Sequence, residues 1–218
     1  MITEKLNIQK LVDEACLMDD FFMKFCLQRH PDVAQLMLQI ILDDDTIQIV
    51  KHRFQDHQEQ LFAKSVIFDA YCVDGNGNEY NIEIQKGDEG ANIKRARFHS
   101  AILDSQMIEK GVKQSDMKHM KDSYVIFICE DDIMKLGNDI YHFERKCNFK
   151  GKEYYANDGN HILYVNGNYA DDTPVGKLVH DLKENDYNKI HYGIIKEAVM
   201  KEKEENEMHL TMEEIYNE

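Results

Sequence analysis

The chain has little of what marks several protein classes. It holds two prolines in 218 residues, so no flexible linker between domains is indicated. Its five cysteines form no Cys-x-x-Cys pair and are odd in number, which argues against a disulfide framework and against a cysteine-bound zinc site. No apolar run approaches the roughly 18 residues of a membrane span, and Met1–Lys10 is too polar for a signal peptide. We therefore expect a cytoplasmic protein without a membrane partner.

Positive charge is also scarce, because 26 Lys and Arg face 41 Asp and Glu and the net charge is −15. Such a chain repels nucleic acid as a whole, so any nucleic-acid binding must depend on a local basic patch or on bound metal. The sequence contains no glycine-rich phosphate loop and no Gly-x-Ser-x-Gly elbow. Hydrophobic residues make up 43% of the chain, which favours a folded domain over disorder.

Hydrophobic periodicity predicts helices before, between and after a set of strands. The helices are expected over residues 4–18, 19–29, 33–42 and 92–110 and from 174 onward, and the strands over 65–73, 79–85, 123–129, 141–143 and 161–165. Either Asp19 or Asp20 can cap the second helix. Residues 46–60 are polar and ambiguous. The order strand, helix, buried strand over residues 79–129 predicts a parallel pair joined by a crossover.

The most informative segment is residues 68–85, which reads as two strands joined by a Gly/Asn turn. A three-residue loop at 75–77 would pair Asp69 with Glu83 on one face of the sheet. A two-residue loop at 76–77 would place the two acids on opposite faces. In the first register the carboxylates lie roughly 5 Å apart, a spacing at which both can bind one divalent metal ion. The alternative interpretation is a surface hairpin whose acids are solvated and bind no metal.

The segment that follows the hairpin is locally basic. Residues 86–121 hold eight Lys or Arg against five acids. Three of these cations lie in the first turns of the helix predicted over 92–110: Lys94, Arg95 and Arg97. Cations there oppose the helix dipole, and a DNA phosphate would remove that cost while accepting hydrogen bonds from the helix amides. Local neutralisation by Asp88 and Glu89 is the alternative.

Five segments together resemble the PD-(D/E)XK nuclease superfamily, and within it the recombination-promoting nuclease and transposase family, over residues 15–165. They are DFFMK at 20–24, KSVIFDAYCVDGNGNEYNIEIQ at 64–85, RARFH at 95–99 followed by Asp104, SYVIFIC at 123–129 and HILYVN at 161–166. Met23 stands where the family has Phe. The resemblance implies an α/β fold with a restriction-endonuclease-like core, in which helices flank a small mixed β-sheet. We expect this domain over residues 1–170 and a helical C-terminal extension over 171–218 that packs on it.

The resemblance also implies a hydrolase, a Mg²⁺-dependent DNA endonuclease linked to transposition or recombination. Asp69 and Glu83 would bind Mg²⁺ or Mn²⁺, and the backbone carbonyl of Ile84 would add a ligand. Asp20 would be a helix acid at the edge of the site, and Gln85 occupies the place of the superfamily's catalytic lysine. The DNA-binding residues would be the basic helix cations, Lys94, Arg95 and Arg97.

Gln85 leaves the chemistry open. An amide can orient a water but lacks the lysine charge, which at ~4 Å and an effective dielectric near 20 is worth about 4 kcal/mol. Either a second cation, Lys94 or Arg97 replaces that charge, or turnover is slow, or the protein is an inactive nuclease fold that acts as a nucleic-acid- or protein-binding module. DNA cleavage in this family commonly implies a homodimer. The expected partners are thus DNA and a second copy, with no organic cofactor.

Overall fold

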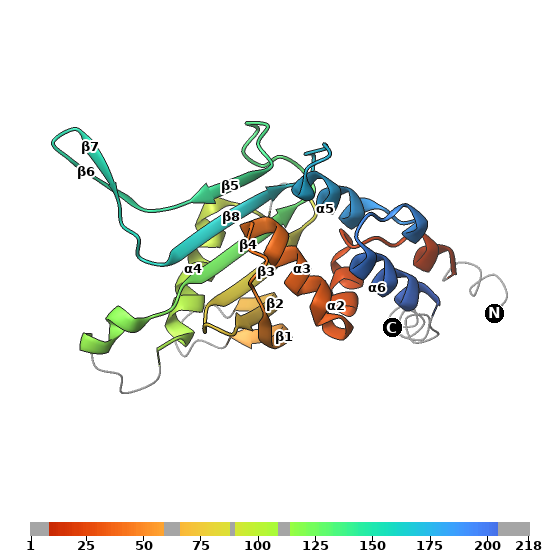
Figure 1. The fold of residues 1–218 in the computed structure, drawn as a ribbon, viewed down its shortest axis with the longest axis horizontal. Helices are drawn as coiled ribbons and strands as arrows, with labels where there is room; N and C mark the ends of the chain where they lie inside the picture. The colour runs from red at the N-terminus through yellow and green to blue at the C-terminus, as the bar shows by residue number, and fades with distance from the viewer. Residues whose placement is uncertain (1–8, 59–65, 88–89, 109–113, 205–218) are drawn as a thin grey trace.

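The computed structural model describes residues 9–58, 66–87, 90–108 and 114–204, and a six-stranded mixed sheet lies at its centre (Figure 1). The strands, in the order in which they neighbour one another, are β1 (Ile49–Gln58), β2 (Val66–Asp74), β3 (Glu79–Gln85), β4 (Ser123–Cys129), β8 (Asn160–Asn166) and β5 (Ile140–Phe143). The β1–β2–β3 portion is antiparallel, β3–β4–β8 is parallel, and β5 runs antiparallel to β8.

Helices cover both faces of the sheet. They are α2 (Asp20–Arg29), α3 (Pro31–Leu42), α4 (Ile93–Gln106), α5 (Pro174–Lys183) and α6 (Gly193–Glu204). On one face, Ala96 and Leu103 of α4 pack with Phe127 and Tyr164 of the sheet. On the other face, α2, α3, α5 and α6 share a second core with apolar side chains such as Ile82. Figure 1 shows α3 and α4 on opposite sides of the sheet.

Strand β3 is buried on both faces, but the two faces differ in polarity. Tyr80, Ile82 and Ile84 belong to the core under α2 and α3. Asn81 and Glu83 point the other way, and their exposed fractions are 0% and 1%. The alternation of a strand therefore places two polar side chains beneath α4.

Most predicted elements are confirmed. The bounds of β3 and β4 match residue by residue, β3 and β4 pair in parallel, and the bounds of α2, α3, β2, β5 and β8 match within two residues. The helix predicted over 92–110 ends earlier, at Gln106. Of the first predicted helix, residues 9–14 are helical, 15–18 are not, and 4–8 lie outside the described residues.

The predicted cap of α2 is wrong in its side-chain detail. Asp19 is the N-cap residue, but its side chain makes no cap hydrogen bond. Its carboxylate instead accepts hydrogen bonds from the backbone N–H of Cys16 and from Nζ of Lys86, at 3.0 and 2.6 Å. Asp19 thereby ties the start of α2 to the residue that follows Gln85.

Three strands have no counterpart in the sequence-based prediction: β1 and the separate pair β6 (Lys146–Phe149) and β7 (Lys152–Tyr155). All residues of β6 and β7 are exposed, so their sequence lacks the alternation that reveals a half-buried strand. Figure 1 shows this pair extending away from the main sheet. β1 is an edge strand, and its residues 50–53 are all exposed, so its sequence likewise lacks this alternation.

The C-terminal helices pack on the core. Leu178 of α5 and Ile195 and Val199 of α6 are fully buried in the core that α2 and α3 share. The described helices α5 and α6 therefore share this core, whereas residues 205–218 lie outside the described part. The domain boundary near residue 170 stays a prediction.

The cysteines form no disulfide, as their number and spacing predict. All five cysteines are free, and Cys26, Cys72 and Cys129 are buried like small apolar residues. Burial raises the pKa of the Cys72 thiol to about 12, so it stays protonated and unreactive. Among the described residues, no helix combines the length and the apolar character that crossing a membrane requires.

Asp74 pairs with Asn78, so the hairpin between β2 and β3 has the predicted three-residue loop at 75–77. Asp74 N–H donates to the carbonyl of Asn78, and Gly77 has a φ of +86°, a conformation that favours glycine. The β2–β3 register, in which Ala70 lies opposite Ile82, then brings Asp69 opposite Glu83 at the next position. The alternative two-residue loop is excluded.

Asp74 stabilises this loop from inside. Its buried carboxylate accepts hydrogen bonds from the backbone N–H groups of Asn76 and Asn78, at 2.9 and 2.8 Å. It also accepts from the Asn78 side-chain amide and from the Tyr80 hydroxyl, both at 2.9 Å. One carboxylate therefore determines the geometry of the turn and, through the turn, the register of the hairpin.

We predict that Asp74→Ala lowers the free energy of unfolding by about 3 kcal/mol, because it leaves several buried donors without an acceptor. Urea denaturation would measure the change. The matched control is Asp45→Ala, at an exposed position, which should stay within about 0.5 kcal/mol of the wild type. Equal stability of the two variants would contradict the role assigned to Asp74.

Candidate active site

Asp69 and Glu83 lie side by side on β2 and β3, and Glu83 lies beneath the start of α4. Asp69 N–H donates to Oε1 of Glu83 at 3.4 Å, and Ile84 N–H donates to Oδ2 of Asp69 at 3.2 Å. Each carboxylate thus accepts a hydrogen bond from the strand that carries the other. The side chains are 15% and 1% exposed, so the pair is largely removed from water.

This geometry places two acids of like charge in a site that is largely removed from water. Burial, and next the negative charge of Glu83, raise the pKa of Asp69 above its ordinary value. The Lys24 ammonium and the Ile84 amide act in the opposite direction but offset only part of the rise. The described groups around Asp69 therefore leave its charge undercompensated.

Lys24 of α2 is the cation nearest to Asp69. Its Nζ lies 3.0 Å from Oδ1 of Asp69 and 2.8 Å from Oδ1 of Asp20, one helical turn earlier. Burial lowers the pKa of Lys24, but its hydrogen bonds with Asp20 and Asp69 outweigh burial and raise it overall. Asp20, predicted as the acid at the edge of the site, is 60% exposed and is linked to Asp69 through Lys24.

Arg95 of α4 brings a second positive charge, on the side of Glu83. Its Nη2 lies 3.3 Å from Oε2 of Glu83, and its Nη1 donates to Oε1 of Gln85 at 3.1 Å and to the carbonyl of Gly90 at 3.0 Å. The guanidinium also lies 5.8 Å from the ring centre of Phe127. These contacts hold Arg95 against the acid pair.

Two further polar groups complete the surroundings of Glu83. Asn81 donates from Nδ2 to Oε1 of Glu83 at 3.0 Å, and Nδ1 of the buried His99 lies 3.3 Å from the same oxygen. Arg95 Nε donates to Nε2 of His99 at 3.3 Å, which orients the imidazole. Glu83 is consequently held by neighbours from both β3 and α4.

Gln85 lies at the end of β3, with its side chain between the hairpin and the loop that leads to α4. Its Oε1 accepts from Arg95, and its Nε2 donates to the carbonyl of Lys86 at 3.2 Å. A Cβ on Gly90 would lie 1.9 Å from Oε1 of Gln85, so glycine at this position makes room for the amide. The Gln85 amide therefore contacts a cation from another element, Arg95 of α4.

The three predicted DNA-binding cations separate into two groups. Lys94 and Arg97 are exposed and have no hydrogen-bond or ion-pair partner among the residues that the structure describes. Arg95 instead points into the acid pair. Asn92 caps the helix by accepting from the N–H of Arg95 at 2.9 Å, as its place before the helix suggests.

Sequence reasoning assigned no role to Lys24 or Asn81, although both carry a signal. Asp20 and Lys24 have the i, i+4 spacing of a helical ion pair. Asn81 is two residues from Glu83 on a strand and so shares its face. What no local pattern contains is that α2 crosses near β2, which brings Lys24 to Asp69.

Comparison with known families decides the classification. The sequence model of the PD-(D/E)XK nuclease family transposases matches residues 18–170. The chain belongs to this family. The match covers nearly the same segment as the resemblance found from the motifs, and it includes α2, the hairpin, α4, β4 and β8. Neither a curated protein nor a solved structure matches the chain.

Membership in the PD-(D/E)XK nuclease transposase family accounts for the architecture. The six-stranded mixed sheet between helices is a restriction-endonuclease-like core, so the predicted fold class is confirmed. The family indicates a nuclease or transposition role. Within this family's fold, Asp69 and Glu83 are the acids that the hairpin register brings together.

We predict that Asp69→Asn raises stability near neutral pH. Because the folded pKa of Asp69 lies above its ordinary value, its ionised form costs the folded state free energy at high pH, and this cost vanishes as the pH falls below the ordinary pKa. A neutral amide removes the cost, so the variant's advantage should be largest at about pH 7 and should shrink in acid.

Thermal unfolding from neutral to acidic pH, in a buffer with EDTA, would measure this difference. Asp45→Asn, an exposed acid far from the pair in sequence, is the control and should show no such trend. A variant less stable than the wild type at neutral pH would mean that Lys24 fully compensates Asp69.

Proposed function

We propose that this protein is a metal-dependent DNA endonuclease of the transposase type, with Asp69 and Glu83 as the metal-binding acids. The observation that carries the proposal is the adjacent acid pair, in which burial and the charge of Glu83 raise the pKa of Asp69. Family membership supports the nuclease class. The metal, the DNA substrate and the residue roles are what the experiments below test.

The residues fit a hard divalent cation. Asp69 and Glu83 offer carboxylate oxygens, and the backbone carbonyl of Ile84 lies between Glu83 and Gln85 on the same strand. An all-oxygen donor set of this kind suits Mg²⁺ or Mn²⁺. When bound, such an ion polarises a phosphodiester and lowers the pKa of a bound water.

Lys24 and Arg95 supply the positive charge that Gln85 lacks. Lys24 Nζ lies 3.0 Å from Asp69, and Arg95 contacts both Glu83 and Gln85. A unit charge at ~4 Å from a phosphate, with an effective dielectric near 20, contributes about 4 kcal/mol. We assign to Lys24 the role of stabilising negative charge on the attacked phosphate. We assign to Arg95 the role of orienting Glu83, and to the Gln85 amide that of orienting a water.

Lys94 and Arg97 are suited to contact the DNA backbone. Both are exposed on the first turns of α4, beside the acid pair that Arg95 of the same helix contacts. In a chain of net charge −15, unpaired cations at this place would attract phosphate locally while the rest of the surface repels it. DNA would thus be directed to the site of chemistry.

Nicking of a supercoiled plasmid in Mg²⁺ or Mn²⁺ tests the proposal. We expect Asp69→Asn and Glu83→Gln each to lower the nicking rate by at least about 100-fold, because each removes a charged oxygen ligand while keeping the side-chain shape. Asp45→Asn should nick at the wild-type rate.

Equal nicking by all four proteins would reveal a contaminating nuclease and refute the proposal. A wild type that binds DNA but does not nick it with either metal would instead favour the inactive binding module. Thermal unfolding of each variant shows whether a loss of activity reflects a loss of folding.

A second pair of variants distinguishes a cation that acts in the cleavage step, Lys24, from a cation that binds DNA, Lys94. Lys24→Gln should lower the nicking rate about 100-fold with little change in DNA affinity. Lys94→Gln should weaken DNA binding and reduce the slope of log affinity against log salt by about 0.9, with little change in rate at saturating DNA. Filter binding over a salt series, beside nicking, measures both. A Lys24→Gln protein with full activity would contradict the role of Lys24.

A further inference from the structure

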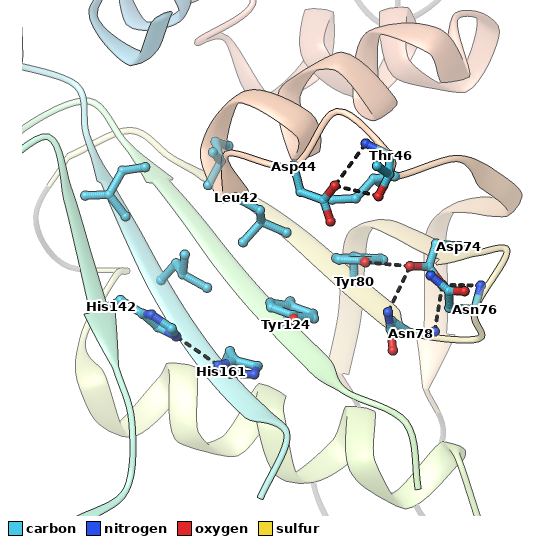
Figure 2. A pocket seen from close by; sticks show the side chains of 14 residues that line it. Leu42, Asp44, Thr46, Asp74, Asn76, Asn78, Tyr80, Tyr124, His142 and His161 are labelled. Carbon is cyan, nitrogen blue, oxygen red and sulfur yellow. Dashed lines mark hydrogen bonds between the residues drawn. The ribbon is translucent and has the colours of Figure 1, made fainter. Parts of the chain in front are cut away.

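The face of the sheet opposite α4 carries a ladder of rings. Tyr80, Tyr124 and His161 lie at matching positions of the neighbouring parallel strands β3, β4 and β8. The ring centres of Tyr80 and Tyr124 are 5.0 Å apart and those of Tyr124 and His161 are 4.5 Å apart, with planes within 16° of parallel. Figure 2 shows these three side chains among those that line a pocket.

The ladder ends in two imidazoles that face each other. His142 of β5 and His161 of β8 are joined by a hydrogen bond between Nε2 and Nδ1 at 2.9 Å, drawn as a dashed line in Figure 2. One of these two nitrogens accepts the hydrogen bond, so it carries no proton and its lone pair is directed at the other ring. Tyr124 stacks on His161 and limits the rotation of its ring.

Strand geometry brings a carboxylate to the same place. Glu144 is two residues beyond His142 and shares its face. Because Phe143 pairs with Ile162, the next position of the register sets Glu144 opposite His161. One potential ligand atom from each of these three residues lies within 4.8 Å of the others. Glu144 has no hydrogen-bond or ion-pair partner within the described part of the chain.

The surroundings resemble those of a metal site. His142 and His161 line a cavity of about 460 Å³ that is open to solvent, and Glu144 lines a neighbouring pocket of about 220 Å³ that also contains His161. On its far side, Nε2 of His161 lies 4.0 Å from Oδ2 of Asp122. A carboxylate behind a histidine commonly sets the tautomer of a metal-binding imidazole.

We propose that His142, Glu144 and His161 form a binding site for a transition-metal ion of the Zn²⁺ class, with a fourth position open to the cavity. Two imidazoles, one carboxylate and an open position are a known ligand set for zinc. Two nitrogens on one tetrahedral Zn²⁺ lie roughly 3.4 Å apart, so the imidazoles need only a small separation from their hydrogen-bonded distance. Mg²⁺ prefers oxygen, so this site and the acid pair select different metals.

A second histidine group near α5 is less suited to a metal. Asp181 lies within reach of His180 and His191, but it is fully buried. Its oxygens already accept the backbone N–H groups of His191 and Tyr192 at 2.8 to 3.0 Å. Its carboxylate therefore holds the loop between α5 and α6.

Titration of the metal-free full-length chain with Co²⁺, followed by its visible absorption, tests the proposal. We expect one Co²⁺ per chain at this site, displaced by Zn²⁺ and retained in excess Mg²⁺. His142→Ala and His161→Ala should each abolish the band. Glu144→Gln should weaken Co²⁺ binding at least about tenfold. Loss of a residue that only hydrogen-bonds to a metal ligand already lowers metal affinity by that factor, and loss of a direct ligand should cost at least as much.

Three controls make the result specific. His119→Ala removes an exposed histidine elsewhere, and His180→Ala disrupts the second group, so both should titrate like the wild type. Asp69→Asn should also keep the band, which makes the outcome independent of the proposed nuclease site. A wild type without a Co²⁺ band, His142→Ala and His161→Ala proteins that titrate like the wild type, or loss of the band in His180→Ala alone would overturn the proposal. Glu144→Gln alters an exposed side chain and keeps the test valid if a histidine variant fails to fold.

Discussion

The repulsion between two buried carboxylates is the constraint on which the rest of the structure depends. The hairpin places Asp69 opposite Glu83, and burial removes the water that would screen them. The fold responds with positive charge from both sides of the sheet: Lys24 from α2 contacts Asp69, and Arg95 from α4 contacts Glu83. Burial, and next the charge of Glu83, still raise the pKa of Asp69, and a divalent cation near the two carboxylates would favour their ionised forms.

Much of this arrangement could be predicted from the sequence because it depends on local rules. The Gly/Asn loop determines the register, and strand alternation determines which side chains share a face, so the meeting of Asp69 and Glu83 was predictable. The apolar run of β4 likewise marked its own burial on both faces. Family motifs added the placement of the hairpin within a nuclease-like sheet.

The cations show where sequence reasoning ends. Lys94, Arg95 and Arg97 are close neighbours in sequence, yet only Arg95 turns toward Glu83, because helical rotation directs the other two to solvent. Lys24 reaches Asp69 across 45 residues of sequence, and that contact depends on how α2 packs, which no local pattern contains. The exposed strands β6 and β7 were missed for a related reason. They bury no side chains, so their sequence shows no alternation of apolar and polar residues.

The same sheet presents different chemistry on its two faces. Toward α4 it offers carboxylates with cations around them, and on the opposite face it offers stacked rings that end in two imidazoles. The two acids lie on β2 and β3, and the two imidazoles lie on β5 and β8. The central claim is that the acid pair binds a hard metal ion. A crystal soaked in Mn²⁺ tests it most directly: the account predicts an anomalous peak between Asp69 and Glu83, with Lys24 Nζ moved away from Asp69. Clear density for both side chains with no peak between them would contradict it.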